Sequence, residues 1–243
     1  MPKVSVIIPV YGVEPFIERC ARSLFEQTLE DMEFIFVDDC SLDKSVEILN
    51  QVVSEYPDRN AAVRELALSK ATGKYIGFCD SDDWVEPNMY EKLVEAAEVQ
   101  DADVVGCGFW EHSIVGITEH TFSHRDDSRE IILSPYFFGG IYGALWNKLI
   151  RKDFFDFASQ DLWKGLSMWE DSCILIPLSL RSSKTIFLDG CLYHYNVNAN
   201  SMTTKFSMKK VNDAIEATRR LERYFHTEGL AGEASSLINY LKI

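Results

Sequence analysis

The sequence predicts an α/β protein with a mostly parallel sheet flanked by helices. Short β-branched runs alternate with helical periodicity through the first hundred residues, and several of these runs end in acidic residues. The clearest case is the apolar run 75–79, which leads into Asp80, Asp82 and Asp83. Open parallel sheets bind ligands at this edge. On these residues alone, a cation that neutralises the carboxylates and a polar turn that caps the next helix are equally good interpretations.

The first strand is expected at 4–10, because the letters VSVIIPV are rich in β-branched residues. Pro9 has no N–H to donate, so we expect it to end the hydrogen-bond ladder of this strand. A helix is expected at 16–25, where apolar residues recur at helical spacing and Pro15 lies in the first turn.

The second strand, 33–37, ends at Asp38 and Asp39 and so creates a second acidic edge. Ser41 or Asp43 can cap the helix that follows, which carries an apolar stripe. Strand, helix, strand and helix with carboxylates at the strand ends are typical of a nucleotide-binding α/β half.

Two further helices are expected, one at 61–72 that ends at Gly73 and one at 87–99. A strand at 103–109 follows. Residues 111–130 are polar and weakly periodic, so we expect an irregular segment or a hairpin there.

The second half of the chain is dense in aromatic residues between 134 and 169. Aromatic side chains at this density build a core or, where they are exposed, stack on sugar rings and bases. Beyond them we expect a helix at 172–180, short strands at 185–188 and 192–195, and a long amphipathic helix at 207–227. Packing within the protein is the preferred interpretation of the last helix, over a partner or a membrane surface.

Composition excludes some functions. Of the 243 residues, 47% are hydrophobic and 26% charged, as in globular proteins. The net charge of −14 and the pI near 4.8 argue against nucleic-acid binding, which needs a basic surface. Six cysteines form no C-x-x-C pair, which predicts no zinc site and a reducing compartment. No signal peptide or bilayer-spanning run is evident, so we expect a cytoplasmic protein, with attachment to the inner face of the cell membrane left open.

Six motifs occur in a specific order over residues 4 to about 203. They are 4–11 (VSVIIPVY), 27–29 with 36–43 (QTL and FVDDCSLD), 71–76 with 80–84 (ATGKYI and DSDDW), 146–149 (WNKL), 169–172 (WEDS), and 192–195 (LYHY) with Ser201. Each motif alone is weak. Together, their order and spacing resemble family 2 glycosyltransferases of the GT-A fold and Asp-x-Asp type.

The resemblance implies a fold and a domain organisation. The fold is the GT-A nucleotide-diphospho-sugar transferase fold, with a Rossmann-like sheet and a C-terminal helical extension. The glycosyltransferase domain is expected at 1–203, with its nucleotide-binding half at about 1–109 and its acceptor half at about 110–203. Residues 204–243 then form the extension.

The resemblance also implies a nucleotide site and a metal site. The expected nucleotide-binding residues are Pro9, Val10, Tyr11, Glu14, Asp39, Arg64, Asp80 and Ser81. Asp39 is expected to accept a hydrogen bond from the base, which favours uracil. Asp80 and Asp82 are expected to hold a divalent cation, Mn²⁺ or Mg²⁺, on the diphosphate, and Asp83 lies close enough in sequence to share this task.

For catalysis, the resemblance implies Asp171 as the base, with Glu170 beside it, and more weakly Trp146, Trp169 and His194 as acceptor-binding residues. Without the resemblance, the two acids are better interpreted as a solvated first helical turn that complements the helix dipole. The tryptophans are more often core residues, and His194 is equally a hydrogen-bonded residue of a half-buried strand.

The implied activity is an inverting, metal-dependent transfer of a hexosyl group. The donor is a nucleotide-sugar, expected to be UDP-linked, and the acceptor is a hydroxyl of a glycan or a lipid-linked oligosaccharide in surface polysaccharide biosynthesis. A hydroxyl nucleophile needs a carboxylate base, and a cation stabilises the departing diphosphate. Peripheral membrane association and a homodimer are left open.

Two rival functions remain at this point. A sugar nucleotidyltransferase is expected to carry a Gly-rich basic loop, and residues 11–14 (YGVE) are neither. The second rival is a nucleotide-sugar-binding protein with a degenerate site. Glu65 stands where the family has Asn, and Asn196 where it has Arg, which mildly favours this rival.

The stretch after the second helix departs from the family pattern in length. A core strand is expected there, and about ten residues are missing for a crossover to close. Either the protein has lost this strand, or the printed sequence lacks residues near Arg59 and Ala61. We favour the second interpretation.

Overall fold

The fold is built on a sheet. The computed structural model of the protein describes residues 1–64, 70–122, 143–157, 160–198 and 207–241. In these ranges the sheet has nine strands in the order β3-β2-β1-β4-β8-β6-β9-β5, and β7 pairs with β6 outside this order. The strands are β1 (Val4–Val10), β2 (Met32–Asp38), β3 (Asn60–Arg64), β4 (Tyr75–Phe78), β5 (Trp84–Val85), β6 (Val104–Ser113), β7 (Gly116–His120), β8 (Lys148–Arg151) and β9 (Thr185–Asn196). The helices are α1 (Ile17–Phe25), α2 (Ser45–Glu55), α3 (Met89–Gln100), α6 (Gln160–Trp163), α7 (Glu170–Arg181), α8 (Met208–Thr227) and α9 (Ser235–Leu241), with a 3₁₀ helix at Lys152–Phe157.

The chain forms two compact units, which we call unit 1 and unit 2. Unit 1 comprises residues 1–123, 145–152 and 186–197 and contains the sheet. Unit 2 comprises residues 124–144, 153–185 and 198–243, and its described part is mainly helical, with α6, α7, α8 and α9.

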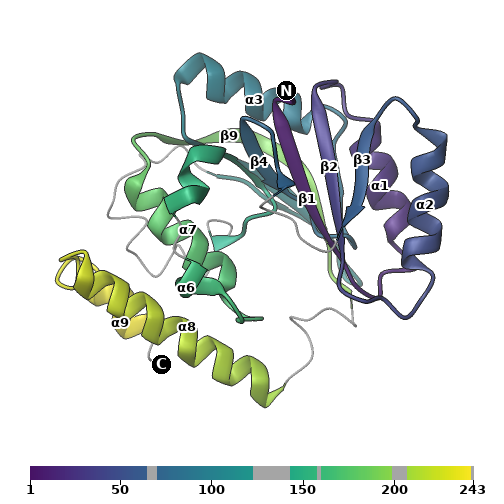
Figure 1. The fold of residues 1–243 in the computed structure, drawn as a ribbon. Coiled ribbons are helices and arrows are strands. Elements are labelled where there is room, and N and C mark those ends of the chain that lie inside the picture. The colour runs from purple at the N-terminus through teal and green to yellow at the C-terminus, as the bar shows by residue number, and fades with distance from the viewer. Residues whose placement is uncertain (65–69, 123–142, 158–159, 199–206, 242–243) are drawn as a thin grey trace. The chain divides into compact units, whose positions relative to one another are not determined.

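Parallel pairing in unit 1 brings four strand ends to one edge. β1 lies between β2 and β4 and is parallel to both, with Ile7 opposite Ile35 on one side and Phe78 on the other. β3 is parallel to β2 on its outer side. Beyond β4 the sheet turns antiparallel, through β8 to β6 and from β9 to β5. The C-terminal ends of β3, β2, β1 and β4 therefore share one edge of the sheet (Figure 1).

Helices α1 and α3 cover the same face of these strands. The Phe25 ring of α1 contacts Phe34 of β2, with ring centroids 5.2 Å apart. Tyr90 of α3 lies over Gly77 of β4, where a Cβ atom would come within 2.7 Å of the Tyr90 ring, so this position requires glycine. Val6 is in register with both Phe34 and Gly77, so both contacts fall on one face. α2 lies beside α1 (Figure 1).

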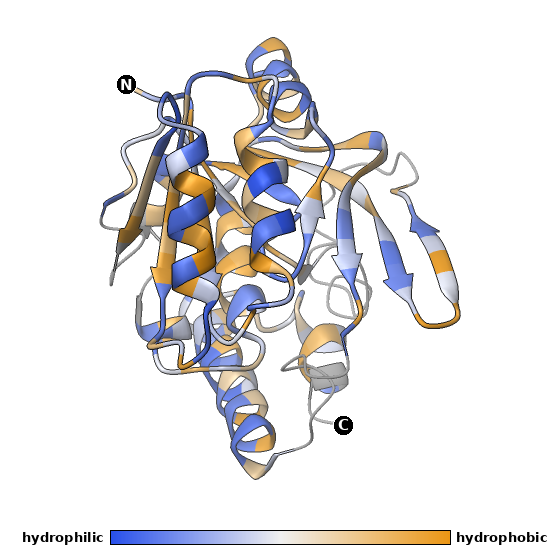
Figure 2. Ribbon diagram, turned by 90° about the vertical axis from the view of Figure 1, so that its right-hand side faces the viewer, coloured by the Kyte–Doolittle hydropathy of each residue, from blue (hydrophilic) through white to orange (hydrophobic). Residues whose placement is uncertain are grey.

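The amphipathic pattern of α1 explains why this segment folds as a helix. Ile17, Cys20, Ala21, Leu24 and Phe25 recur at helical spacing and are all buried. In Figure 2 the helices carry hydrophobic and hydrophilic residues on different sides, and the strands behind them include long hydrophobic runs. Burial of the helical stripes on the sheet supplies the main stabilisation of unit 1.

Two sequence-based expectations about residues 56–72 are wrong. Residues 60–64 form strand β3, whereas the sequence predicts a helix that begins at Ala61 and no strand before β4. The letters NAAVR have weak β-propensity, and pairing with β2 outweighs it. Residues 65–69 of the expected helix lie outside the described residues.

The core strand expected near Arg59 and Ala61 is formed by residues of the printed sequence. The chain enters β3 without interruption, since the Arg59 N–H donates to the Tyr56 carbonyl (3.0 Å). Asn60 then pairs with Glu33 of β2. The core strand is therefore present, and it begins directly after a short turn that follows α2.

Three smaller differences concern strand ends. Pairing between β1 and β2 continues to Val10, so Pro9 does not end the ladder on that side, although pairing with β4 stops at Ile7. Residues 185–196 form one strand rather than two, and Gly190 lies inside it at φ +92°. Of the alternatives for residues 111–130, the described part forms a β6–β7 hairpin, and residues 123–130 lie outside the described residues.

The helices of unit 2 agree with the sequence pattern. The expected helix 172–180 is observed as α7, and 207–227 as α8. The Ser207 side chain caps α8 by accepting a hydrogen bond from the Lys210 N–H (3.3 Å). Among the residues that the structure describes, no helix combines the length and the apolar character needed to span a bilayer.

Candidate active site

The residues expected to bind a nucleotide gather at the edge where the parallel strands end. Those of unit 1 are Pro9, Val10 and Tyr11 at the end of β1, Asp39 after β2, and Asp80 and Ser81 after β4. Arg64 is the last residue of β3, and its side chain lies outside the described part of the structure. The parallel register thus brings together backbone segments that lie up to 70 residues apart in sequence.

Two loops at this edge are joined by hydrogen bonds. The Val13 N–H donates to Ser45 Oγ (3.0 Å), and the Glu14 N–H donates to Asp43 Oδ2 (3.0 Å). In return, the Lys44 N–H donates to the Glu14 carboxylate (3.1 Å). Glu14 therefore uses its carboxylate at the start of α2, and the two loops form one rim beside the end of β1.

Asp39 differs from the acidic residues around it. The Asp38 carboxylate accepts from the Ser41 N–H (3.0 Å) in the loop before α2, and Asp43 accepts from the Ser45 N–H (3.1 Å) at the start of α2. The Asp39 N–H donates to the Val10 carbonyl (3.0 Å), and its side chain is exposed. Within the described residues no protein group bonds the Asp39 carboxylate, which leaves it available to a ligand.

The turn 80–83, which we call the acidic turn, is held from within the sheet. Asp83 is fully buried, and its carboxylate accepts from the Tyr193 hydroxyl (2.7 Å) and from the Asn196 N–H (2.7 Å). The Asp80 N–H donates to the same Tyr193 oxygen (3.1 Å). β9 therefore fixes both ends of the acidic turn.

Burial and like charge act on the protonation of this turn. Burial raises the pKa of Asp83 well above its usual range, and the nearby Asp80 and Asp82 carboxylates raise it further. The Tyr193 hydroxyl and the Asn196 N–H oppose the shift because they stabilise the ionised form. Burial, with Asp83 next to it, also raises the pKa of the Tyr193 hydroxyl well above its usual value.

Helix α1 supplies a cation and a thiol beneath the acidic turn. Arg19 donates to the Asp82 carbonyl (3.2 Å), and its guanidinium lies 3.5 Å from the centroid of the Trp84 ring. Burial lowers the pKa of Arg19, whereas Asp83 and Asp82 act to raise it. Cys20 Sγ lies 3.7 Å from the Asp80 carbonyl oxygen. Arg19 thus adds positive charge to a group of carboxylates that otherwise repel one another.

A divalent cation at the acidic turn would be held by its two less buried carboxylates. Both oxygens of Asp83 accept hydrogen bonds inside the protein, whereas Asp80 and Asp82 are only half-buried. Among the described residues, no three His, Cys, Asp or Glu side chains converge on one metal position. Two carboxylates suit Mg²⁺ or Mn²⁺ bound together with phosphates, because such ions take one or two protein carboxylates.

The expected catalytic residues lie in unit 2. Glu170 and Asp171 are half-buried in the first turn of α7, and Trp169 precedes them with a left-handed backbone (φ 64°). Burial raises the pKa of Glu170, the Asp213 charge adds to this shift, and Lys209 opposes it. A carboxyl group with a raised pKa is a better proton acceptor once it is ionised.

Two of the expected acceptor-binding residues belong to aromatic clusters of unit 1. Trp146 stacks on Tyr193 with centroids 4.4 Å apart. His194 stacks on Trp84 (4.8 Å), and its two ring nitrogens contact His112 (2.9 Å) and Glu86 (2.9 Å). Burial lowers the pKa of His112, as does His194. Neither Trp146 nor His194 is brought to the exposed rim beside β1.

Sequence reasoning missed Tyr193, the backbone of Asn196 and Arg19. Tyr193 lies within a quoted motif, but nothing local links it to an acid 110 residues earlier. The Asn196 side chain departs from the family pattern, yet its contact with Asp83 uses the backbone N–H and needs no particular side chain. Arg19 occupies an ordinary polar position of α1, with no signal in the sequence.

Comparisons with known proteins agree with this architecture. The sequence model described as Glycosyl transferase family 2 matches residues 5–157. The chain is 30% identical to the uncharacterized glycosyltransferase EpsJ of Bacillus subtilis strain 168 over 262 aligned positions, which cover 98% of this chain and 74% of EpsJ.

Solved structures show the same fold. S. aureus TarS, residues 1–349, in complex with UDP-GlcNAc superposes with a TM-score of 0.67 at 21% identity, over 92% of this chain and 73% of that one. The mannosyltransferase PcManGT of Pyrobaculum calidifontis, in complex with GDP-Man and Mn²⁺, gives a TM-score of 0.62 at 14% identity, over 98% of this chain and 70% of that one. The expected GT-A fold is thereby confirmed.

Proposed function

The chain belongs to glycosyl transferase family 2, and we propose that it transfers a hexosyl group from a UDP-linked sugar to a hydroxyl with inversion at the anomeric carbon. The observation that carries this proposal is the shared edge of β1, β2 and β4, where the exposed Asp39 carboxylate follows β2 and the acidic turn follows β4, on either side of β1. This arrangement suits a ligand with a hydrogen-bonding base at one end and a diphosphate at the other.

For the donor, we assign the base and ribose to the rim formed by Pro9, Val10 and Tyr11. The exposed Asp39 carboxylate accepts a hydrogen bond from an N–H of the base, a group that uracil carries at N3. The TarS complex with UDP-GlcNAc supports this choice, and the PcManGT complex with GDP-Man makes a guanine donor the alternative outcome. Glu14, Arg64 and Ser81 complete the expected nucleotide-binding set.

For the metal, Asp80 and Asp82 would hold a divalent cation, Mn²⁺ or Mg²⁺, together with the diphosphate. When bound, the cation supplies Lewis-acid stabilisation of the charge that develops on the leaving diphosphate. Asp83 serves a different purpose, because its carboxylate is already held by Tyr193 and the Asn196 N–H. Its hydrogen bonds to β9 hold the acidic turn in place.

For the transfer step, Asp171 removes the proton of the acceptor hydroxyl as the oxygen attacks the anomeric carbon. The new carbon–oxygen bond forms on the face opposite the bond to UDP, which breaks and leaves with its electron pair. One displacement inverts the anomeric configuration and needs no covalent intermediate. Glu170, whose pKa is raised by burial, lies next in sequence and either assists Asp171 or takes its role.

Three wider assignments rest on the family resemblance. Residues 1–203 form the transferase domain, with a nucleotide-binding half at about 1–109 and an acceptor half at about 110–203, and residues 204–243 form an extension. The acceptor is a glycan or a lipid-linked oligosaccharide of surface polysaccharide synthesis. The site of action is the cytoplasm, at the inner face of the cell membrane.

Calorimetric titration of UDP, with and without Mn²⁺, tests the donor site. We expect Mn²⁺ to strengthen UDP binding to the wild type, and Asp82→Ala to abolish this enhancement. Asp58→Ala, which removes an exposed carboxylate of the turn after α2, is the matched control and should behave as wild type. GDP bound in preference to UDP would redirect the donor assignment. UDP binding without turnover of any UDP-sugar would favour a binding protein with a degenerate site.

A further inference from the structure

Helix α8 contacts the segment that leads into the candidate catalytic acids. This segment, residues 161–169, comprises most of α6 and the connection to α7, and it ends directly before Glu170. Two residues of α8, Asp213 and Arg220, hold it at two points. They lie seven residues apart, so they project from the same side of the helix about 10 Å apart along its axis.

The first point of contact is Ser167. The Asp213 carboxylate accepts from the Ser167 N–H (3.0 Å) and from the Ser167 hydroxyl. Lys209, one turn earlier on α8, donates to Ser167 Oγ (2.7 Å) and pairs with Asp213 (3.2 Å). The hydrogen bonds from Ser167 lower the pKa of Asp213, with Lys209 contributing, so the carboxylate is ionised at neutral pH.

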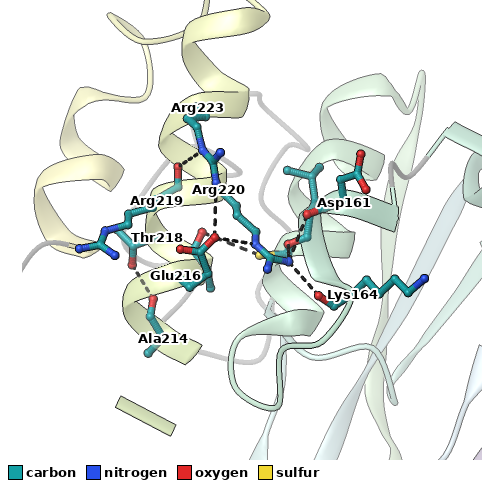
Figure 3. A network of polar contacts seen from close by, with 11 residues as sticks. Asp161, Lys164, Ala214, Glu216, Thr218, Arg219, Arg220 and Arg223 are labelled. Carbon is teal, nitrogen blue, oxygen red and sulfur yellow. Dashed lines mark hydrogen bonds and ion pairs between the residues drawn. The ribbon is translucent and has the colours of Figure 1, made fainter. Parts of the chain in front are cut away.

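The second point of contact is the C-terminal end of α6. Arg220 Nη1 donates to the carbonyls of Asp161 (3.1 Å), Leu162 (3.5 Å) and Lys164 (2.9 Å) (Figure 3). Its Nε donates to Glu216 (3.0 Å), which orients the guanidinium. The last carbonyls of a helix lack partners within the helix, and a cation at this end complements the helix dipole.

The backbone between these contacts and the acids is strained. Trp169 has a left-handed backbone (φ 64°), which a residue with a large side chain adopts at a cost. Its carbonyl accepts from the Cys173 N–H (3.1 Å), so this conformation sets where α7 begins. A strained residue keeps its conformation when its surroundings hold both sides. α7 holds one side, and Asp213 and Arg220 hold the other through residues 161–167.

We propose that Asp213 and Arg220 are positioning residues that fix the start of α7, and with it Glu170 and Asp171, for the transfer step. This inference rests on the proposed function, in which Asp171 is the base. Asp213, Arg220 and α7 all lie beyond the family match at residues 5–157, so the match assigns them no role. A displacement of about 1 Å in a catalytic group costs up to about 100-fold in rate.

The test compares Arg220→Ala with Arg223→Ala. Arg223 lies on the same helix and contacts the same Glu216 (3.4 Å), but among the described residues its other hydrogen bond goes to the Arg219 carbonyl of α8 and not to α6. UDP release is measured from the UDP-hexose that the wild type turns over fastest, beginning with UDP-GlcNAc. We expect Arg220→Ala to lower kcat roughly 10- to 100-fold with the KM for the donor unchanged, and Arg223→Ala to match wild type.

Normalising kcat to the number of UDP-binding sites, measured by calorimetry, separates positioning from a loss of folded protein. If kcat per UDP-binding site in Arg220→Ala equals that of wild type, the proposal is overturned. Asp213→Asn is the second variant, for the case that Arg220→Ala does not fold, and the same comparison applies. Arg220→Lys should recover part of kcat, because an ammonium can donate to some of the three carbonyls but lacks the planar fork.

Amide hydrogen exchange makes the inference independent of turnover. Exchange at Ser167 and at the first turn of α7 should accelerate in Arg220→Ala and Asp213→Asn and remain unchanged in Arg223→Ala. If the wild type turns over no UDP-sugar, the proposed function fails, whereas accelerated exchange would still show that α8 holds this segment. Unchanged exchange in both variants would remove the structural basis of the proposal.

Discussion

The acidic turn in unit 1 and the acid pair in unit 2 reach their positions by different physical means. In the acidic turn, Asp83 is buried and bonded by β9, a strand formed more than 100 residues later in the chain. Glu170 and Asp171 are half-buried at a helix start, and the segment before them is held by side chains of α8. The comparison teaches that a strand end is fixed by burial in the sheet, whereas a helix start depends on hydrogen bonds made by its preceding loop.

The largest effect is expected for the acid pair of unit 2, because it supplies the proposed base. Asp171→Asn removes the proton acceptor but keeps the size of the side chain, so kcat should fall about 10²- to 10⁴-fold. UDP affinity, measured by calorimetry, should stay unchanged because the nucleotide edge lies in unit 1. Glu170→Gln is the neighbouring control. A larger loss in Glu170→Gln than in Asp171→Asn would transfer the role of base to Glu170.

The second effect concerns stability. Tyr193→Phe removes a hydrogen bond to the buried Asp83 carboxylate and should cost about 1.5–3 kcal/mol in the free energy of unfolding. Tyr56→Phe removes a bond of the same length, 2.7 Å, to the exposed Glu26, and should cost less than about 0.5 kcal/mol. Urea unfolding measures both. Equal losses of unfolding free energy in the two variants would contradict the view that burial makes the Tyr193–Asp83 hydrogen bond more stabilising.

Glu33 sharpens the comparison within unit 1, because it is a nearly buried carboxylate whose pKa moves in the opposite direction to that of Asp83. Burial acts to raise the pKa of Glu33, but hydrogen bonds from Ser5 and from Thr72 outweigh it, and the pKa lies below its usual value of 4.5. A lowered pKa in the folded state stabilises the protein above pH 4.5 and loses this effect as the pH falls through the lowered value.

Glu33→Gln should therefore cost about 1 kcal/mol of unfolding free energy at pH 7, and this difference from wild type should shrink at acidic pH. Urea unfolding at pH 7 and at several acidic values measures it. Glu30→Gln, an exposed neighbour, is the control and should follow wild type at each pH. A difference that stays constant with pH would show that the Glu33 charge plays no part.

The smallest effect is expected on the pH dependence of turnover. Burial and the Asp213 charge raise the pKa of Glu170, and Lys209 opposes them. Asp213→Asn removes a negative charge and leaves Lys209 in place, so the pKa of Glu170 should fall. If Glu170 takes the role of base, the acid limb of kcat/KM should then move to lower pH by less than about one unit. Asp161→Asn, an exposed acid of the same unit, should leave the limb in place, and an unmoved limb in Asp213→Asn would contradict this coupling.

Much of the nucleotide edge could be predicted from the sequence, because its signal is local. Buried parallel strands have short apolar sequences. An acidic residue directly after such a run must lie at the edge of the sheet. This places Asp39 and the acidic turn without knowledge of any distant contact. Helix α8 was also within reach, because its apolar residues recur at helical spacing, whereas α7 is a continuous apolar run with no such stripe.

The other features of the fold and of the candidate site depend on contacts between residues that are far apart in the sequence, so no local pattern predicts them. β3 has weak β-propensity and exists because the edge of β2 accepts it. Asp189 and Gly190 read as a turn, yet β9 continues through them because Gly190 adopts a positive φ (+92°) inside the strand. The partners of Asp83 are 110 and 113 residues away.

The hold of β9 on Asp83 also sets an order of events during synthesis on the ribosome. β1, β2 and β4 can pair once residue 78 has emerged, whereas Asp83 lacks its two partners until residue 196 is available. At about 5–20 residues per second, this delay lasts roughly 6–24 seconds. A nascent chain thus completes the parallel strands well before it can fix the acidic turn. A fragment that stops after the β6–β7 hairpin would keep the sheet edge but leave Asp83 without either partner.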